Sequence, residues 1–137
     1  MFTTLMIPVD LAHTDQMAKA VTVTANLATL YSTTAHMVGV TMSGPTKIAT
    51  GEADFTEKLA SFANWCSDAH GVTFNPVVRT SNDLSIDLDS ILMQTAKELN
   101  ANLVIMASHT PGLTEHIFAS NAGYVASHSE TSVMVIR

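Results

Sequence analysis

Short apolar runs alternate along this chain with longer segments of helical periodicity, and few folds satisfy such an alternation. Five runs are typical of buried strands, namely residues 2–9, 35–42, 72–79, 103–107 and 132–137. Between them, apolar side chains recur at a spacing of three and four residues, as on one face of a helix. Strands that alternate with helices predict βαβ units with right-handed crossovers. We therefore expect an α/β fold, a doubly wound, five-stranded parallel sheet with helices on both faces.

Several single residues predict where these elements begin, end or touch. Thr14 is placed to cap the first helix, and Asp87 to cap the third. Gly71 is a natural left-handed residue after the second helix. Gly39, inside an apolar run, implies that a neighbouring element closely approaches the backbone there. Pro76 cannot donate a backbone hydrogen bond, so its strand is expected at an edge of the sheet.

Length, composition and charge restrict the class of protein. The 137 residues fit one domain over 1–137, and 47% hydrophobic against 13% charged residues is enough for a buried core. The net charge of −6 repels the phosphates of nucleic acid, and no apolar run reaches the roughly 18–20 residues that span a bilayer. The single cysteine, Cys66, has no partner for an internal disulfide, which favours the cytoplasm. We expect neither a nucleic-acid partner nor a membrane partner.

Ligands of doubly wound sheets bind outside the carboxyl ends of the strands, where the connections turn to opposite faces. Here these ends hold Asp10, Val40, Thr80 and the loop after Ala107. The chain lacks the G-x-x-x-x-G-K-[ST], G-x-G-x-x-G and G-x-S-x-G signatures, so P-loop hydrolysis, a dinucleotide fingerprint and a hydrolase elbow are not supported. The histidines lack the spacing of metal ligands, and we predict no metal site.

Motifs spread along the chain carry a resemblance to a known family. They are MIPVD at the start, MVGV in the second apolar run, LVIMASH around the fourth, the triplet SNA at 120–122, and SVMVIR at the end. With these motifs the chain resembles the universal stress protein family over nearly its whole length, and ASHTP followed by SNA is similar to one branch of it. The resemblance implies a Rossmann-like sheet with strand order 3-2-1-4-5. It also implies a homodimer through the strand at Ser132–Arg137 and a site for ATP or AMP.

The resemblance further implies which residues hold the nucleotide. Those for the adenosine are Pro8, Val9, Asp10 and Val40. The family motif G-x2-G-x9-G-[ST] wraps the ribose and the phosphates. The residues here that match it, or lie beside it, are Met106, Ala107, Ser108, His109, Thr110, Gly112, Ala119, Ser120, Asn121 and Ala122.

This chain departs from that motif where phosphate would bind. Alanine or threonine replaces each of its three glycines, at Ala107, Thr110 and Ala119, and the second spacer is one residue shorter. An added Cβ keeps the backbone away from a phosphate, and no Lys or Arg occurs between Lys97 and Arg137. The phosphates would then depend on backbone N–H groups and the start of the fourth helix, with Ser120 as its cap and Mg²⁺ as an added partner.

These patterns predict a cytoplasmic, dimeric nucleotide-binding protein that acts in stress regulation rather than as a turnover catalyst. We assign no catalytic residue, and Ser108 and Ser120 are the candidate phosphoacceptors if an ATPase or autophosphorylation activity exists. The alternative is a dimeric protein-interaction module of the same fold without nucleotide binding. Asp10 has two interpretations, as an adenosine ligand or as the cap and turn residue after the first strand. His109 is interpreted as a loop-packing residue.

Overall fold

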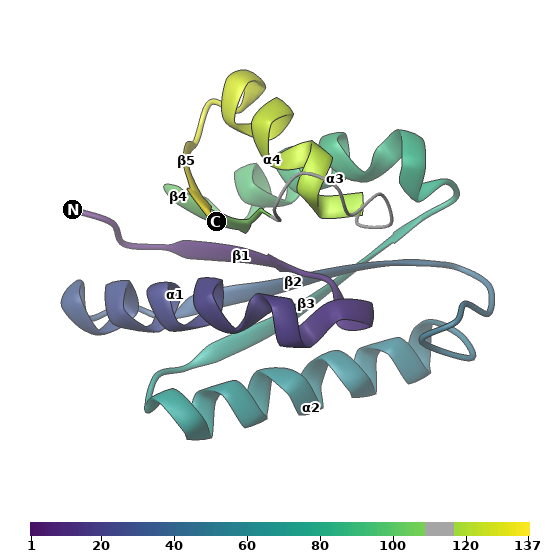
Figure 1. The fold of residues 1–137 in the computed structure, drawn as a ribbon, viewed down its shortest axis with the longest axis horizontal. Coiled ribbons are helices and arrows are strands. Elements are labelled where there is room, and N and C mark those ends of the chain that lie inside the picture. Colours follow the sequence, from purple (N-terminus) through teal and green to yellow (C-terminus); the bar gives the residue numbers. More distant parts are fainter. Residues whose placement is uncertain (109–116) are drawn as a thin grey trace.

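The structure is a computed structural model that describes residues 1–108 and 117–137, with the backbone alone described over 117–120. Its elements, in chain order, are β1 (Leu5–Val9), the 3-10 helix η1 (Leu11–Met17), α1 (Ala18–Leu30), β2 (Ala35–Met42), α2 (Glu52–His70), β3 (Phe74–Ser81), α3 (Leu84–Glu98), β4 (Leu103–Ala107), α4 (Ile117–His128) and β5 (Ser132–Ile136). All the strand pairs are parallel, and the sheet has the order β3-β2-β1-β4-β5 (Figure 1). The predicted α/β class and strand order are confirmed.

The helices divide between the two faces of the sheet. Residues of α1 and α2 pack with one set of strand residues, and residues of α3 and α4 pack with the alternate set. On β1, for example, Leu5 and Ile7 face the first pair of helices and Met6 faces the second. The central strand β1 and its neighbour β4 are buried along their whole length, because helices cover both of their faces.

The predicted edge position of the Pro76 strand is also confirmed, since β3 pairs with β2 alone. Its outer backbone groups are occupied at alternate positions. The N–H of Phe74 donates to Ser67 Oγ at 3.0 Å, Pro76 has no N–H, and the carbonyl of Val78 accepts from Arg79 at 3.1 Å. These features make this edge a poor template for a further strand.

Both glycine predictions are confirmed. Gly71 follows α2 with φ of 68°, in the left-handed region, and its N–H donates to the carbonyl of Ser67. At Gly39 an added Cβ would lie 2.8 Å from Phe55 Cε1 and 3.0 Å from Leu59 Cδ2. Helix α2 is therefore seated directly on the backbone of β2.

The two predicted helix caps are wrong. Helical backbone starts directly after β1 with η1, and the carboxylate of Asp10 caps η1. The N-cap of α1 is Met17, which makes no side-chain cap hydrogen bond, so Thr14 caps neither helix. In α3 the cap is Asp83, whose Oδ1 accepts the N–H of Ser85 at 3.0 Å. Asp87 lies in the first turn, where it accepts a hydrogen bond from the hydroxyl of Ser81 at 3.1 Å.

Candidate functional site

The neighbouring strands β1 and β4 separate toward their carboxyl ends. The pairing of β1 with β4 ends at Met6↔Val104, whereas β1 stays paired with β2 up to Val9↔Gly39 and β4 with β5 up to Ala107↔Ile136. This separation coincides with the change of face in the connections, because α1 lies on one face of the sheet and α3 and α4 lie on the other. It is the place at which doubly wound sheets bind their ligands.

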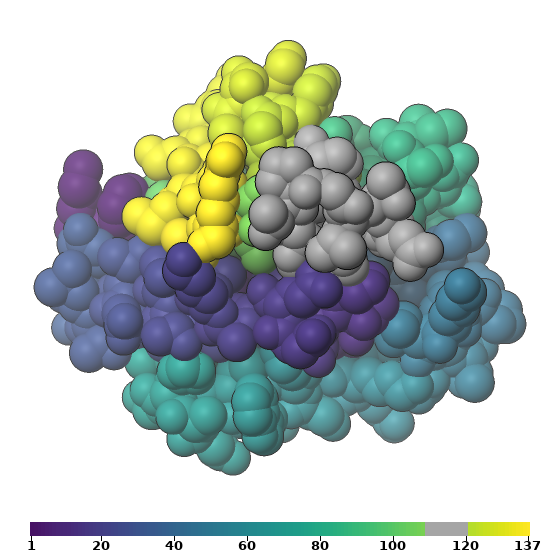
Figure 2. Space-filling model, in the orientation of Figure 1, coloured from purple at the N-terminus to yellow at the C-terminus, as the bar shows by residue number. Residues whose placement is uncertain are grey.

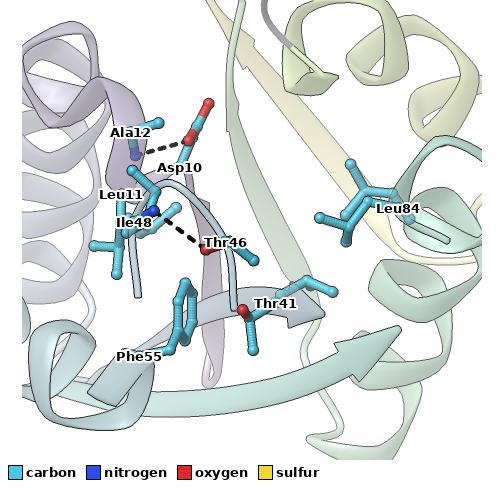
Figure 3. Close-up of a pocket in the computed structure, with 11 residues that line it drawn as sticks. Asp10, Leu11, Ala12, Thr41, Thr46, Ile48, Phe55 and Leu84 are labelled. Carbon is cyan, nitrogen blue, oxygen red and sulfur yellow. Dashed lines mark hydrogen bonds between the residues drawn. The ribbon is translucent and has the colours of Figure 1, made fainter. Parts of the chain in front are cut away.

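A cavity of about 150 Å³ opens at the carboxyl ends of β1 and β2, and we call it the strand-end cavity (Figure 3). Its walls come from the β1–η1 turn, the end of β2, the loop after β2, and the helices α2 and α3. The lining residues are Val9, Asp10, Leu11, Ala12, Val40, Thr41, Thr46, Ile48, Phe55, Leu84 and Leu88. Figure 3 shows Leu84 on the side of the cavity opposite Leu11 and Ile48.

The walls are mostly apolar. Val9, Val40 and Phe55 are buried side chains, at 1%, 8% and 5% exposure. Among the described lining residues, only Asp10, Thr41 and Thr46 carry polar groups on their side chains, and none is Lys or Arg. An apolar cleft of this size with few polar groups suits one flat ring system with hydrogen-bonding substituents rather than a highly charged ligand.

The loop between β2 and α2 is held in place by its own hydrogen bonds. Thr46 Oγ1 accepts the N–H groups of Ile48 and Ala49, both at 3.2 Å. Lys58, on α2, donates to the carbonyl of Ile48 and pairs with Asp54 at 3.2 Å. The N–H of Thr50 donates to the Asp54 carboxylate and is the main reason that the pKa of this group is lowered. The side of the cavity formed by Ile48 is therefore preformed.

Among the described residues that line the cavity, Asp10 is the one with an ionisable side chain. Its Oδ1 accepts the N–H of Ala12 at 2.9 Å, and its Oδ2 lies 2.9 Å from Nδ1 of His13. The side chain is 19% exposed. The cap role, one of the two interpretations of this residue, is confirmed. The same carboxylate also has lone pairs left for a ligand, because two oxygens can accept about four hydrogen bonds.

The structure brings together only part of the predicted site. Val9, Asp10 and Val40 line the strand-end cavity, whereas Pro8 lies inside β1 opposite Val38. Three other predicted residues are buried in the core and do not line the cavity: Met106, Ala107 and Ala122. A ligand could reach them through the backbone only, since their side chains are 1–7% exposed.

The remaining predicted residues follow β4. Ser108 is half-buried and its N–H donates to the carbonyl of Ile136 at 2.7 Å, and Asn121 is half-buried on α4. Ser120 lies inside α4, which is described from Ile117 onward, so its predicted place at the N-cap is wrong. Ala119 is placed by its backbone alone. Three predicted residues lie outside the described part of the chain: His109, Thr110 and Gly112.

Sequence reasoning missed the cavity residues that come from the helices and from the loop after β2. Phe55 is the first residue of the apolar stripe on α2, and Gly39 indicated a close neighbour there. Leu84 and Leu88 show no signal beyond helical periodicity, because their contribution depends on how α3 crosses the sheet.

Two further properties concern the described residues, 1–108 and 117–137. No group of three or more His, Cys, Asp or Glu side chains is arranged there to hold a metal ion. None of the helices in this part combines the length and the apolar character needed to cross a membrane.

Comparisons with known proteins agree with this architecture. Universal stress protein G from Salmonella typhimurium (strain LT2) is 34% identical over 47 residues, which are 34% of this chain and 33% of that protein, so the match spans about a third of the relative. A universal stress protein from Archaeoglobus fulgidus has a TM-score of 0.75 at 17% identity, covering 100% of both chains. A structure of the universal stress protein from Archaeoglobus fulgidus in complex with dAMP has a TM-score of 0.71 at 14% identity, covering 98% of both chains.

A crystal structure of a universal stress protein in complex with cAMP has a TM-score of 0.70 at 16% identity, covering 99% of this chain and 97% of the other. At these identities the likeness shows the fold. The sequence profile of the Universal stress protein family matches residues 1–137, the whole of the sequence. The chain therefore belongs to the universal stress protein family.

Proposed function

We propose that this protein binds an adenine nucleotide, ATP or AMP, with the adenine or adenosine part in the strand-end cavity. The observation that carries the proposal is that Val9, Asp10 and Val40, from the ends of two adjacent strands, line one apolar cavity at the switch point of the sheet. Two relatives of the same fold were solved with cAMP and with dAMP, which supports an adenine ligand. We further propose that the protein acts in the cytoplasm as a stress-response regulator rather than as a turnover catalyst.

The composition of the cavity wall indicates which part of the ligand supplies the affinity. The wall has buried apolar side chains for a ring, and Asp10 offers acceptor sites to a hydroxyl or amine. The described part of the wall offers no Lys or Arg to a phosphate, and the carboxylate of Asp10 repels a phosphate. We therefore expect adenosine and AMP to retain most of the affinity, and ATP to gain little unless Mg²⁺ neutralises its charge.

A thermal-shift titration of nucleotide-free protein with adenosine, AMP, ADP and ATP, each with and without Mg²⁺, tests this proposal. A ligand at about 100 times its Kd adds about 2.7 kcal/mol, which raises the Tm of a chain of this size by roughly 5–11 °C. Val40→Phe fills the cavity and should abolish the shift. Val77→Phe, at a half-buried position of β3 outside the cavity, is the matched control and should keep it. The absence of any shift in wild type at millimolar ligand would refute the proposal.

A second candidate function is a dimeric protein-interaction module that does not bind nucleotide. It is favoured by the replacement of all three motif glycines and by the lack of Lys or Arg in the described cavity wall. The same titration separates the two candidates, because this one predicts no response to any of the four ligands.

Both candidates include a homodimer through β5, and the two edges of the sheet differ in a way that supports it. The outer edge of β3 is occupied as described above, whereas β5 pairs with β4 alone among the described strands. Figure 2 shows the C-terminal segment at the surface beside the first helix. Every residue of β5 from Val133 to Ile136 is half-buried, while the adjacent β4 is fully buried. Pairing with a twofold-related β5 would cover both the backbone groups and the apolar side chains.

Light scattering of wild type and of Val135→Pro tests the dimer. The N–H of Ser108 donates to the carbonyl of Ile136, so Ile136 turns its backbone groups toward β4 and Val135 turns its own outward. Proline at 135 therefore removes an N–H from the free edge without breaking the pairing to β4. We expect twice 14.6 kDa for wild type and 14.6 kDa for the variant. A wild-type monomer at every concentration would contradict the dimer.

A further inference from the structure

The turn that follows β1 holds Asp10 from two directions. One oxygen of its carboxylate accepts the N–H of Ala12, and the other lies 2.9 Å from the imidazole Nδ1 of His13. The N–H of His13 also donates to the carbonyl of Asp10 at 3.1 Å. His13 itself interrupts η1 with φ of −138° and ψ of 48°, outside the helical region. This departure from helical backbone accompanies a side chain directed at the carboxylate three residues earlier.

A carboxylate held by both of its oxygens differs from one that is free to rotate. Each bond leaves a lone pair on its oxygen, so Asp10 can still accept from a ligand while its plane is fixed. The cost of ordering the side chain then belongs to folding and not to ligand binding. The position of the pair supports this role. Asp10 lines the cavity, whereas His13 is not a lining residue and contacts the carboxylate of Asp10, with 28% of its own side chain exposed.

The hydrogen bond also restricts the state of the imidazole. An ionised carboxylate only accepts, so Nδ1 of His13 must carry the proton, either as the neutral Nδ1–H tautomer or as the imidazolium. In both states the bond holds the carboxylate of Asp10 in one orientation.

We infer that His13 is a positioning residue of the nucleotide site, which prepares Asp10 to accept a hydrogen bond from a hydroxyl or amine of the ligand. This inference rests on the adenine-nucleotide site proposed above. It assigns His13 no contact with the ligand and no role in proton transfer. Its effect on affinity is transmitted entirely through the carboxylate of Asp10.

Calorimetric titration with adenosine, which carries no phosphate, compares wild type with His13→Leu and His13→Asn. Leucine removes the donor at similar bulk, whereas the amide nitrogen of asparagine occupies the place of Nδ1 and still donates. We expect His13→Leu to lose roughly five- to tenfold in affinity, because one hydrogen bond to a charged group is lost. We expect His13→Asn to stay within about twofold of wild type, since the donor is kept.

The double variant Asp10→Ala/His13→Leu separates positioning from general structural support. If His13 acts through Asp10, the double variant binds adenosine no more weakly than Asp10→Ala alone. Additive losses would overturn the inference, as would wild-type affinity in His13→Leu or equal losses in His13→Leu and His13→Asn. If the wild type binds no adenosine, the proposed nucleotide site itself is refuted. If the wild type binds adenosine and the variants give any of the outcomes just named, the role of His13 alone is refuted.

Nitrogen NMR of the imidazole in the ligand-free protein gives a second measurement that needs no variant to fold. The geometry predicts a proton on Nδ1 of His13 at neutral pH. An imidazole protonated on Nε2 alone would have no hydrogen to donate to Asp10, and it would overturn the inference whatever the affinities are.

Discussion

Replacing Gly39 by alanine tests how closely α2 approaches β2. The new Cβ would lie 2.8 Å from Phe55 Cε1, 2.9 Å from Phe55 Cζ and 3.0 Å from Leu59 Cδ2. Carbon atoms rest at about 3.5–4.0 Å, so the ring of Phe55 must retreat by roughly 0.7 Å. Leu59 is fully buried in packed core, and Phe55, at 5% exposure, is packed on all sides except where it lines the strand-end cavity.

Overpacking of this kind costs about 1–3 kcal/mol. For a chain of 137 residues this corresponds to a fall in Tm of roughly 2–12 °C, measured by calorimetry or circular dichroism. Gly44→Ala is the matched control, because an added Cβ there meets nothing within 4 Å. Its Tm should stay close to that of wild type.

A second substitution tests the proposed cause of the loss. Phe55→Leu shortens the side chain that the new Cβ meets, so the two substitutions together should destabilise the protein by less than the sum of their separate effects. Because Phe55 also lines the strand-end cavity, Gly39→Ala should weaken adenosine binding as well. A Tm within about 1 °C of wild type for Gly39→Ala would refute this account, because the overpacking cost would then be absent.

Three further outcomes follow from the contacts of single residues. Gly123→Ala, in α4 with open space around the added Cβ, should raise the free energy of unfolding by about 0.5–1 kcal/mol in urea titrations, and a decrease would contradict this. Hydrogen bonds from Ser85 lower the pKa of the Asp83 carboxyl, so its stabilising contribution is present at neutral pH and is lost as the pH falls through the lowered value. The difference in urea midpoint between wild type and Asp83→Ala should therefore narrow from pH 7 toward pH 3, and a constant difference would argue against the charged cap. Burial raises the pKa of the Cys66 thiol to about 11, so a thiol reagent at pH 8 should label it only when denaturant unfolds the protein, and fast labelling in native buffer would contradict its burial.

The fold could be predicted because its signals are local. The apolar runs have strand length, the stripes between them have helical spacing, and Pro76 excludes its strand from the centre of the sheet. The strand order 3-2-1-4-5 required the family resemblance, since alternation alone does not say which strands are neighbours. The structure agrees with it.

The helix caps were beyond local reasoning. Asp83 and Asp87 lie four residues apart, and both are residue types that cap helices. The structure selects Asp83 because β3 ends at Ser81 and the chain turns at once into α3, which leaves Asp87 inside the helix and bound to the hydroxyl of Ser81. The sequence locates a strand end only approximately, because the exact residue at which a strand stops is set by its pairing with a neighbour.

The candidate site divides in the same way. The rule that ligands bind at strand ends located Asp10 and Val40, and the family resemblance added Val9. The same rule named Thr80, which does not line the cavity. The opposite wall, with Phe55, Leu84 and Leu88, comes from helices whose approach to the sheet depends on packing between residues far apart in the chain.

Hydrophobic periodicity, together with the Gly and Pro residues that end elements, is thus enough to predict the fold class, the order of the elements and the approximate strand ends at which a ligand site is expected. They act between near neighbours, whose geometry is set by backbone sterics and spacing. The cavity itself depends on tertiary contacts, because its walls combine strand ends with residues of α2 and α3. Those contacts are fixed only when the two helical layers close on the sheet, because distances across the core follow from packing and not from the order of residues.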